Sequence, residues 1–292
     1  MEPAARPRSL LSQTKELLRS AGLEAKKSLG QHFLVDGSYL KEILSAAELT
    51  GDDQVIEVGP GLGVLTQALA ERAGKVIAVE KDDNLSALLK ERLASYDNVA
   101  IVNADIMKAD MVSLVAMFGT GDAPRYKVVA NLPYYITSPV LRLFLESRTK
   151  PERLVVMVQK EVARQICAQP GDMSLLSVGI QLYGQPKIVK YVPARAFYPP
   201  PDVDSAILKI SVLPARRIDV DEKDFFTMVR AGFSAARKQI GNSLAKGLAL
   251  PKEEVLTLLA AAGIDARRRA ETLSIEEWGR LWGEYNRVVK PE

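Results

Sequence analysis

The residues best suited to chemistry lie at positions 131–134, Asn-Leu-Pro-Tyr, directly after the apolar run 126–130. The run predicts a buried strand, and ligands of open parallel sheets bind just beyond the carboxyl ends of strands. There Asn131 and a backbone carbonyl near Leu132 could accept both hydrogens of an exocyclic amine, while Tyr134 stacks on the base that carries it. The alternative is a strand-to-helix turn with a surface asparagine and a core tyrosine.

A glycine loop follows an earlier buried-strand run, residues 54–58. The loop reads Gly-Pro-Gly-Leu-Gly at 59–63 and leads straight into a helical pattern. Gly59 and Gly61 would let a ligand lie against the backbone at the helix N-terminus. Val64 occupies the place where a dinucleotide fold has its third glycine. The spacing therefore favours another nucleotide-type cofactor, and a nicotinamide dehydrogenase is the rival with the same kind of sheet.

Two acidic residues follow the next two predicted strands. Residues 75–79 end at Glu80, about 20 positions past the glycine loop, where a carboxylate can accept both hydroxyls of a ribose. Residues 99–102 precede Asp105, which could accept from the amine of a cofactor adenine. Each acid could instead simply cap the following helix. Four consecutive strands thus carry a polar group at the carboxyl end, which favours one shared site.

The alternation of strands and helices predicts an α/β fold with a doubly wound, mostly parallel sheet whose last strand is antiparallel. A helix is expected at 39–49 with Ser38 as its N-cap. After Pro214 the pattern changes to short helices without strands, which predicts a small all-helical domain. The expected divisions are an N-terminal arm and basic loop at 1–36, a catalytic domain at 37–213 and a helical RNA-binding domain at 214–292.

Composition narrows the possible classes. The chain has one cysteine and one histidine, too few to supply the four ligands of a zinc site, so no metal is expected. A single cysteine also fits a reducing cytoplasm. No apolar run reaches the ~18–20 residues of a membrane span. We expect a cytoplasmic monomer that binds no membrane.

The net charge of +3 permits a nucleic-acid partner without requiring one, so an RNA site must come from local clustering. Six basic residues form such clusters, with a solvated surface of mixed charge as the alternative; they are Lys26, Lys27, Arg237, Lys238, Arg267 and Arg268.

Five stretches carry a resemblance to a known family: residues 27–34 (Lys-Ser-Leu-Gly-Gln-His-Phe-Leu), 59–63, 131–134, 197–205 and 233–244. The chain resembles the small-subunit (16S) ribosomal RNA adenine-N6,N6-dimethyltransferases, which have a class I methyltransferase fold. The resemblance implies S-adenosylmethionine as cofactor and 16S ribosomal RNA, or the small-subunit precursor, as partner. The proline-rich loop at 197–205 and the C-terminal segment at 233–244 resemble these enzymes more than the related large-subunit enzymes of antibiotic resistance.

The resemblance also implies roles for single residues. Cofactor contacts are implied for His32, Leu34, Gly59, Glu80, Asp105 and Asn131. Contacts to the target adenine are implied for Asn131, Leu132 and Tyr134, with Phe197 on the other face of the base. Many family members have Asn in place of His32, and Phe197 could instead be a core aromatic. No general base, metal or covalent nucleophile is needed, and a non-catalytic RNA-binding factor on the same fold is the second rival.

Overall fold

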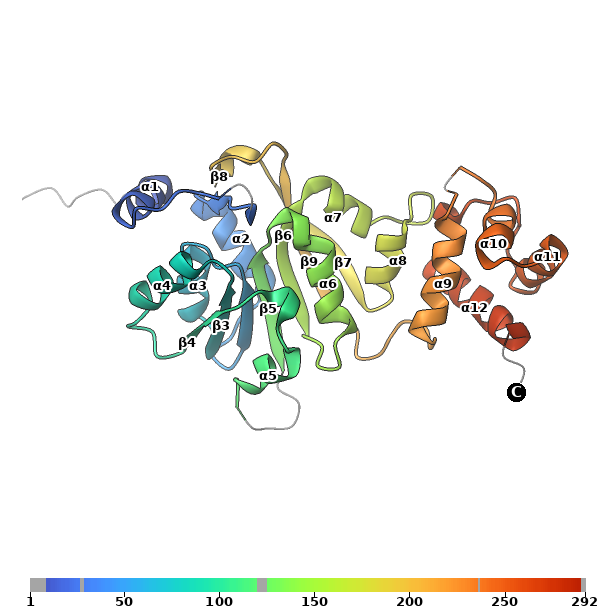
Figure 1. The fold of residues 1–292 in the computed structure, drawn as a ribbon, viewed down its shortest axis with the longest axis horizontal. Coiled ribbons are helices and arrows are strands. Elements are labelled where there is room, and N and C mark those ends of the chain that lie inside the picture. Colours follow the sequence, from blue (N-terminus) through green and yellow to red (C-terminus); the bar gives the residue numbers. More distant parts are fainter. Residues whose placement is uncertain (1–8, 27–28, 120–124, 236, 290–292) are drawn as a thin grey trace, which may run out of the picture. The chain divides into compact units, whose positions relative to one another are not determined.

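The computed structural model describes residues 9–26, 29–119, 125–235 and 237–289 (Figure 1). Contacts within the chain divide it into two compact units. The first contains Met1–Ala163 and Lys187–Val212, and the second contains Arg164–Pro186 and Leu213–Glu292. Each unit is therefore built from two separate stretches of the sequence, with the division inside one helix, α7 (Lys160–Ile166), and one strand, β7 (Gly184–Val192).

The first unit is organised by a seven-stranded sheet in the order β4-β3-β2-β5-β6-β9-β7 (Figure 1). Strands β2 to β6 are parallel to one another, and β9 is antiparallel to its neighbour β6. The predicted doubly wound sheet is confirmed. Its remaining strands are β2 (Gln54–Val58), β3 (Lys75–Glu80), β4 (Val99–Asn103), β5 (Tyr126–Asn131), β6 (Arg153–Gln159) and β9 (Ser205–Val212).

Both faces of this sheet are covered. Alternate residues of one strand point to opposite faces, so burial of two successive residues shows that both faces are covered there. Val55 and Val129 belong to a core cluster shared with α2 (Gly37–Ala47) and α3 (Val64–Ala70). The residues beside them on the same strands, Ile56 and Val128, are also completely buried. Burial on both faces explains why these strands read as continuous apolar runs. The remaining helices of this part are α1 (Leu10–Ser20), α4 (Asp83–Arg92), α5 (Met111–Ala116) and α6 (Thr137–Glu146).

Two local expectations were wrong or incomplete. Helix α2 is capped by Asp36, whose carboxylate accepts from the N–H of Ser38, so Ser38 is the second residue of the helix and not its N-cap. The basic loop before α2 and the proline-rich loop (197–205) were expected to be loops without strands, the second one stiff and extended. Instead they contain short strands, β1 (Phe33–Leu34) and β8 (Phe197–Tyr198), that pair antiparallel. Two-residue strands give no periodicity, so the sequence could not reveal them.

The second unit is helical. It contains α8 (Leu175–Gln181), α9 (Glu222–Phe233), α10 (Ile240–Leu248), α11 (Lys252–Ala261) and α12 (Ile275–Val289), the last four drawn in orange to red in Figure 1. Small residues let the helices approach closely. A Cβ added at Gly232 would lie 2.4 Å from the Trp278 ring, and one at Gly247 would lie 2.6 Å from Ala231. None of the helices formed by the described residues is long and apolar enough to cross a membrane.

Candidate active site

A cavity lies where the order of the strands reverses. The chain runs outward from β2 to β3 and β4 and then returns to β5 beside β2. Open sheets bind ligands at such a switch point. The cavity is lined by the glycine loop 59–62, the end of β3, residues 104–107 and residues 29–34 and 131–136. Most of the polar groups expected from the sequence therefore meet in one place.

Asn131 is the last residue of β5, and its orientation is fixed. Its Nδ2 donates to the backbone carbonyl of His32 at 2.9 Å. Because Nδ2 is the donor, Oδ1 is the free half of the amide, and within the described residues no protein donor reaches it. Leu132 is buried and its N–H donates to the carbonyl of Met157 at 3.2 Å, which anchors the backbone immediately after Asn131. The site thus holds an amide oxygen with acceptor capacity at the cavity wall.

Tyr134 begins the short 3-10 helix Tyr134–Ile136 and is held at two points. Its hydroxyl lies 2.6 Å from the hydroxyl of Ser205. Its ring lies near that of His32, with centroids 5.9 Å apart and planes inclined by 23°. Burial raises the pKa of the Tyr134 phenol above its ordinary value, so the ring stays neutral at physiological pH. A fixed neutral aromatic ring in the same cavity as a free acceptor can receive a base that carries an amine.

The glycine loop takes a backbone shape that favours glycine. Gly59, Gly61 and Gly63 have φ of 66°, 58° and 78°, all in the left-handed region. A Cβ would also lie 3.0 Å from the Phe33 ring at Gly61 and 2.7 Å from Leu89 at Gly63. The glycines are thus needed for packing against the protein as well as for room beside the backbone.

Two buried carboxyl groups line the cavity. Glu80 accepts from the N–H of Gly61 at 3.1 Å and from that of Asp82 at 2.9 Å, one bond to each oxygen. Each carboxylate oxygen can accept a second hydrogen. Burial raises the pKa of Glu80, although its backbone hydrogen bonds act in the other direction. This is the position expected to accept ribose hydroxyls.

Glu57 is a cavity residue that the sequence analysis missed. It is 1% exposed, and its Oε2 has no hydrogen-bond partner among the described residues. Burial raises the pKa of Glu57 to about 8, with a further contribution from the negative charge of Glu80. A charged residue inside the apolar run 54–58 was the signal that could have identified it.

Asp105 lies at the expected edge of the cavity and makes two interactions. One oxygen accepts from the N–H of Met107 at 3.0 Å, which is the capping role considered as its alternative. The other lies 2.9 Å from Nζ of Lys81. The hydrogen bond from Lys81 is the main reason that the pKa of Asp105 is lowered, so the carboxylate is ionised. The adenine-binding role of Asp105 stays a prediction.

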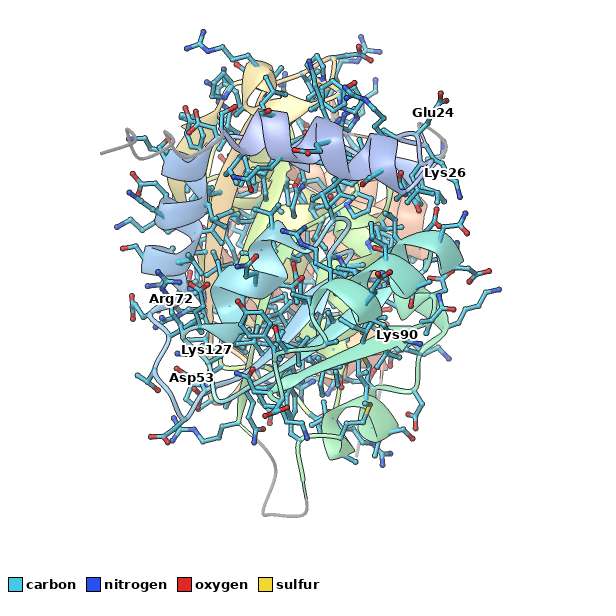
Figure 2. The ribbon with its side chains drawn as sticks, turned by 90° about the vertical axis from the view of Figure 1, so that its left-hand side faces the viewer. Glu24, Lys26, Asp53, Arg72, Lys90 and Lys127 are labelled. Atoms are coloured by element: carbon cyan, nitrogen blue, oxygen red, sulfur yellow. The ribbon has the colours of Figure 1, made fainter. Side chains whose placement is uncertain are left out.

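The structure places two of the predicted residues, Phe197 and Lys26, outside the lining of the cavity. Phe197 is 3% exposed and belongs to the core cluster that includes Ile43, and it does not line the cavity. Lys26, which Figure 2 places beyond the end of α1, donates to Asp82 at 2.6 Å. Lys27 lies outside the described residues. The core-aromatic interpretation of Phe197 is thus the one that its position favours, whereas Leu34, also buried, does line the cavity.

The predicted RNA-binding residues of the second unit differ in their surroundings. Arg268 donates to both carboxylate oxygens of Glu277 and to the carbonyl of Thr272. Arg267 is exposed and pairs with Asp265. Arg237 and Lys238 are exposed, and no acidic side chain of the described residues pairs with either. Only the last pair therefore has the free cationic groups that phosphate contacts use.

The cavity suits S-adenosylmethionine. Its ribose hydroxyls and ammonium group are donors, and the cavity offers the unpartnered oxygen of Glu57 and the remaining capacity of Glu80. In the part of the chain that the structure describes, no group of three His, Cys, Asp or Glu side chains could hold a metal ion.

Comparison with known proteins agrees with this geometry. The family model described as ribosomal RNA adenine dimethylase matches residues 22–287. A ribosomal RNA small subunit methyltransferase A from Dehalococcoides mccartyi is 54% identical over 279 residues, covering 95% of this chain and 94% of that protein. The corresponding protein of Moorella thermoacetica is 48% identical over 275 residues, covering 92% and 95%.

Two solved structures are also similar. The dimethyladenosine transferase of Plasmodium falciparum has a TM-score of 0.74 at 25% identity, covering 88% of this chain and 98% of that one. The 23S rRNA methyltransferase ErmE has a TM-score of 0.67 at 30% identity, covering 86% and 98%.

Sheet order, glycine loop and acceptor-lined cavity together define a class I methyltransferase that uses S-adenosylmethionine. Within that class, Asn131 with its free amide oxygen and the aromatic residue Tyr134 both line the cavity, which suits an enzyme acting on a base amine. The chain belongs to the ribosomal RNA adenine dimethylase family. The rival interpretation as a nicotinamide dehydrogenase is thereby excluded.

Proposed function

We propose that this enzyme transfers two methyl groups to the exocyclic amine of adenines in 16S ribosomal RNA during assembly of the small subunit. The names of the 54% and 48% identical relatives support the small subunit as the target. The expected division of labour remains part of the proposal, with catalysis in residues 37–213 and RNA binding in residues 214–292 and the N-terminal arm. The proposal also includes that the enzyme acts as a monomer in the cytoplasm.

The observation that carries the proposal is the orientation of Asn131. Its Nδ2 donates to the carbonyl of His32, which leaves Oδ1 free to accept a hydrogen from a substrate. The amine of adenine is a poor nucleophile because its lone pair is delocalised into the ring. Acceptance of its two hydrogens by Oδ1 and by a backbone carbonyl near Leu132 favours a pyramidal nitrogen, whose lone pair then points at the methyl group.

Positioning accounts for the rest of the mechanism. The sulfonium of S-adenosylmethionine supplies an already activated methyl group, so holding the amine in line with it supplies most of the rate. The positive charge that develops on nitrogen is stabilised by the same two acceptors and by the ring of Tyr134. The second transfer requires that one acceptor tolerate a methyl group in place of a hydrogen.

The test is methylation of purified RNA. Unmethylated 16S RNA, 23S RNA and assembling small subunits are each incubated with the enzyme and S-adenosylmethionine, and the adenine products are identified by mass spectrometry. We expect N6,N6-dimethyladenosine in the 16S RNA, free or in the assembling subunit. Product in 23S RNA alone would assign the enzyme to the large-subunit type, to which ErmE belongs. No product in any RNA, from protein that still binds the cofactor, would favour a non-catalytic RNA-binding factor.

A further inference from the structure

His32 is the only histidine in the chain, and the family resemblance places it among the cofactor contacts. Its own hydrogen bonds lead elsewhere. The imidazole Nδ1 lies 2.8 Å from the carbonyl of Pro199, and its backbone carbonyl accepts from Asn131. Its ring lies against Tyr134. One residue thus touches the proline-rich loop and both side chains proposed to handle the adenine.

The contact with Pro199 continues the short antiparallel ladder between β1 and β8. Phe33 lies opposite Tyr198, and the same register places His32 opposite Pro199. Proline has no N–H and cannot donate in a ladder. The carbonyl of Pro199 can only accept, so Nδ1 of His32 carries the hydrogen. A side-chain bond thereby extends the ladder by one step and fixes the orientation of the imidazole ring.

Tyr134 is then held from two directions. His32 lies against its ring, while Ser205, the first residue of β9, holds its hydroxyl at 2.6 Å. The first contact limits tilting of the ring, and the second limits sliding of the ring in its own plane. A ring fixed in both ways presents a defined face to an incoming base.

We propose that His32 is a positioning residue for methyl transfer, joining the proline-rich loop to Asn131 through its carbonyl and to Tyr134 through its imidazole. The proposal rests on the roles given above to Asn131 and Tyr134. It assigns the imidazole to alignment of the target adenine, so His32 serves the RNA side of the site.

The experiment separates alignment from cofactor binding. Variants His32→Ala, His32→Asn and His32→Phe are compared with wild type and with Lys41→Ala, an exposed change on α2. Calorimetry gives the dissociation constant of S-adenosylmethionine, and single-turnover kinetics at saturating cofactor give the rate of transfer. We expect His32→Ala and His32→Asn to slow transfer on the order of tenfold, as loss of one aromatic contact and one hydrogen bond suggests. The cofactor constant should change less than about threefold.

His32→Phe keeps a ring against Tyr134 and should be faster than the other two variants. A cofactor constant weakened about tenfold in His32→Ala, with a normal rate at saturation, would overturn the proposal and make His32 a cofactor ligand. Equal rates in all three variants and wild type would overturn it as well.

A double-mutant cycle tests the shared route through Tyr134. Because His32→Ala and Ser205→Ala both release this ring, the double variant should be only slightly slower than the slower single variant. If the rate losses of the two single variants multiplied in the double variant, His32 would not act through Tyr134. Asn131→Ala serves as the reference for the underlying mechanism. A slow Asn131→Ala with a normal His32→Ala would reject only the positioning role, whereas a normal Asn131→Ala would reject the proposed mechanism itself.

Discussion

The two ends of strand β5 use polar side chains in opposite ways. At its amino end, Lys127 is nearly buried and donates to Asp53 at 2.9 Å and to the carbonyl of Glu48 at 2.8 Å. Lys127 and Asp53 lie side by side in Figure 2. At the carboxyl end, four residues further along, Asn131 leaves an amide oxygen open to the cavity. One strand therefore carries a paired charged side chain, Lys127, near its amino end and an unpaired amide oxygen, that of Asn131, at its carboxyl end.

The pKa values follow the same division. At the amino end, burial would raise the pKa of Asp53, but hydrogen bonds from Lys127 and Thr50 outweigh it and lower the pKa. A hydrogen bond from Lys209 lowers the pKa of Glu48. At the carboxyl end, burial dominates and raises the pKa of both Glu57 and Glu80. Partnered charge stabilises the sheet, whereas unpartnered polar groups at the other edge are available to ligands at a cost to stability.

The largest effect is expected at the reactive edge. Asn131→Ala removes the acceptor proposed to align the amine, which should cost on the order of 2–4 kcal/mol of transition-state stabilisation, or roughly 30- to 1,000-fold in rate. Cofactor affinity should fall only modestly, and the free energy of unfolding should stay close to that of wild type. Single-turnover kinetics, calorimetry and urea unfolding give the three quantities. Near-normal turnover would remove Asn131 from the mechanism.

The reverse pattern is expected four residues earlier. Lys127→Met keeps the length of the side chain but leaves Asp53 without its cation, with side-chain exposures of 10% and 18% for the pair. Breaking a buried ion pair costs about 3–5 kcal/mol, and partial hydration of Asp53 points to the lower end. Urea unfolding measures the loss, and the transfer rate of the folded variant should stay within about threefold of wild type. A stable but inactive variant would contradict the division between the two ends.

A pH series distinguishes the two groups of carboxylates. The pKa of Glu57 is about 8 in the folded protein and 4.5 ordinarily, so folding takes up a proton between these values. The stability of wild type should therefore fall as pH rises from about 5 to 8, by up to about 1.4 kcal/mol per pH unit. Glutamine does not titrate, so the free energy of unfolding of Glu57→Gln should fall less over the same pH range.

Asp53→Asn is the matched control from the other end. The lowered pKa of Asp53 contributes stability that is present above the ordinary pKa and lost as the solution is acidified. The difference in free energy of unfolding between Asp53→Asn and wild type should thus change with pH only in acidic solution. Urea unfolding without cofactor at half-unit steps between pH 3.5 and 8 follows both variants; parallel curves for Glu57→Gln and wild type would show that Glu57 is ionised in the folded protein.

The smallest effect extends the comparison to the helical unit. The double variant Arg237→Ala/Lys238→Ala removes two free cations and should weaken RNA binding roughly three- to tenfold, reducing the salt slope by about 1–2. Its unfolding should be unchanged. Arg268→Ala breaks the contacts with Glu277 and should instead lose about 1–2 kcal/mol of stability with RNA affinity largely kept. RNA binding at two salt concentrations and thermal unfolding measure the two effects. If Arg268→Ala lost RNA affinity and the double variant lost stability, ion pairing within the protein would not distinguish the structural arginine from the two cations proposed to bind RNA.

The sequence predicted the sheet well because its signal is local. Each buried parallel strand reads as an apolar run, and the run expected at 54–58 matches β2 residue for residue. The positions of Glu80 and Asn131 followed from the same rule, since both come at strand ends. Long-range contacts gave no such signal. The pairing of β1 with β8 joins residues that are 163 and 165 positions apart, and both strands are too short to show a period.

Phe197 and Glu57 show the same limit in the site. An aromatic residue in a proline-rich loop looks suited to stacking on a base, but its burial beside Ile43 depends on that unseen strand pairing. A glutamate inside an apolar run looks like an irregularity until the sheet order places it at the switch point. Side-chain direction is set by the partners across the fold, which the neighbouring residues do not encode.

The central claim is that Asn131 Oδ1 accepts a hydrogen of the target amine while Nδ2 is retained by His32. The most direct measurement is a crystal structure of the enzyme with S-adenosylhomocysteine and an RNA fragment containing the adenine. We predict about 2.7–3.2 Å between Oδ1 and N6 of the adenine, with the bond from Nδ2 to the His32 carbonyl intact. An adenine seated in the cavity with N6 more than about 4 Å from Oδ1, or with the amide reversed, would contradict the account.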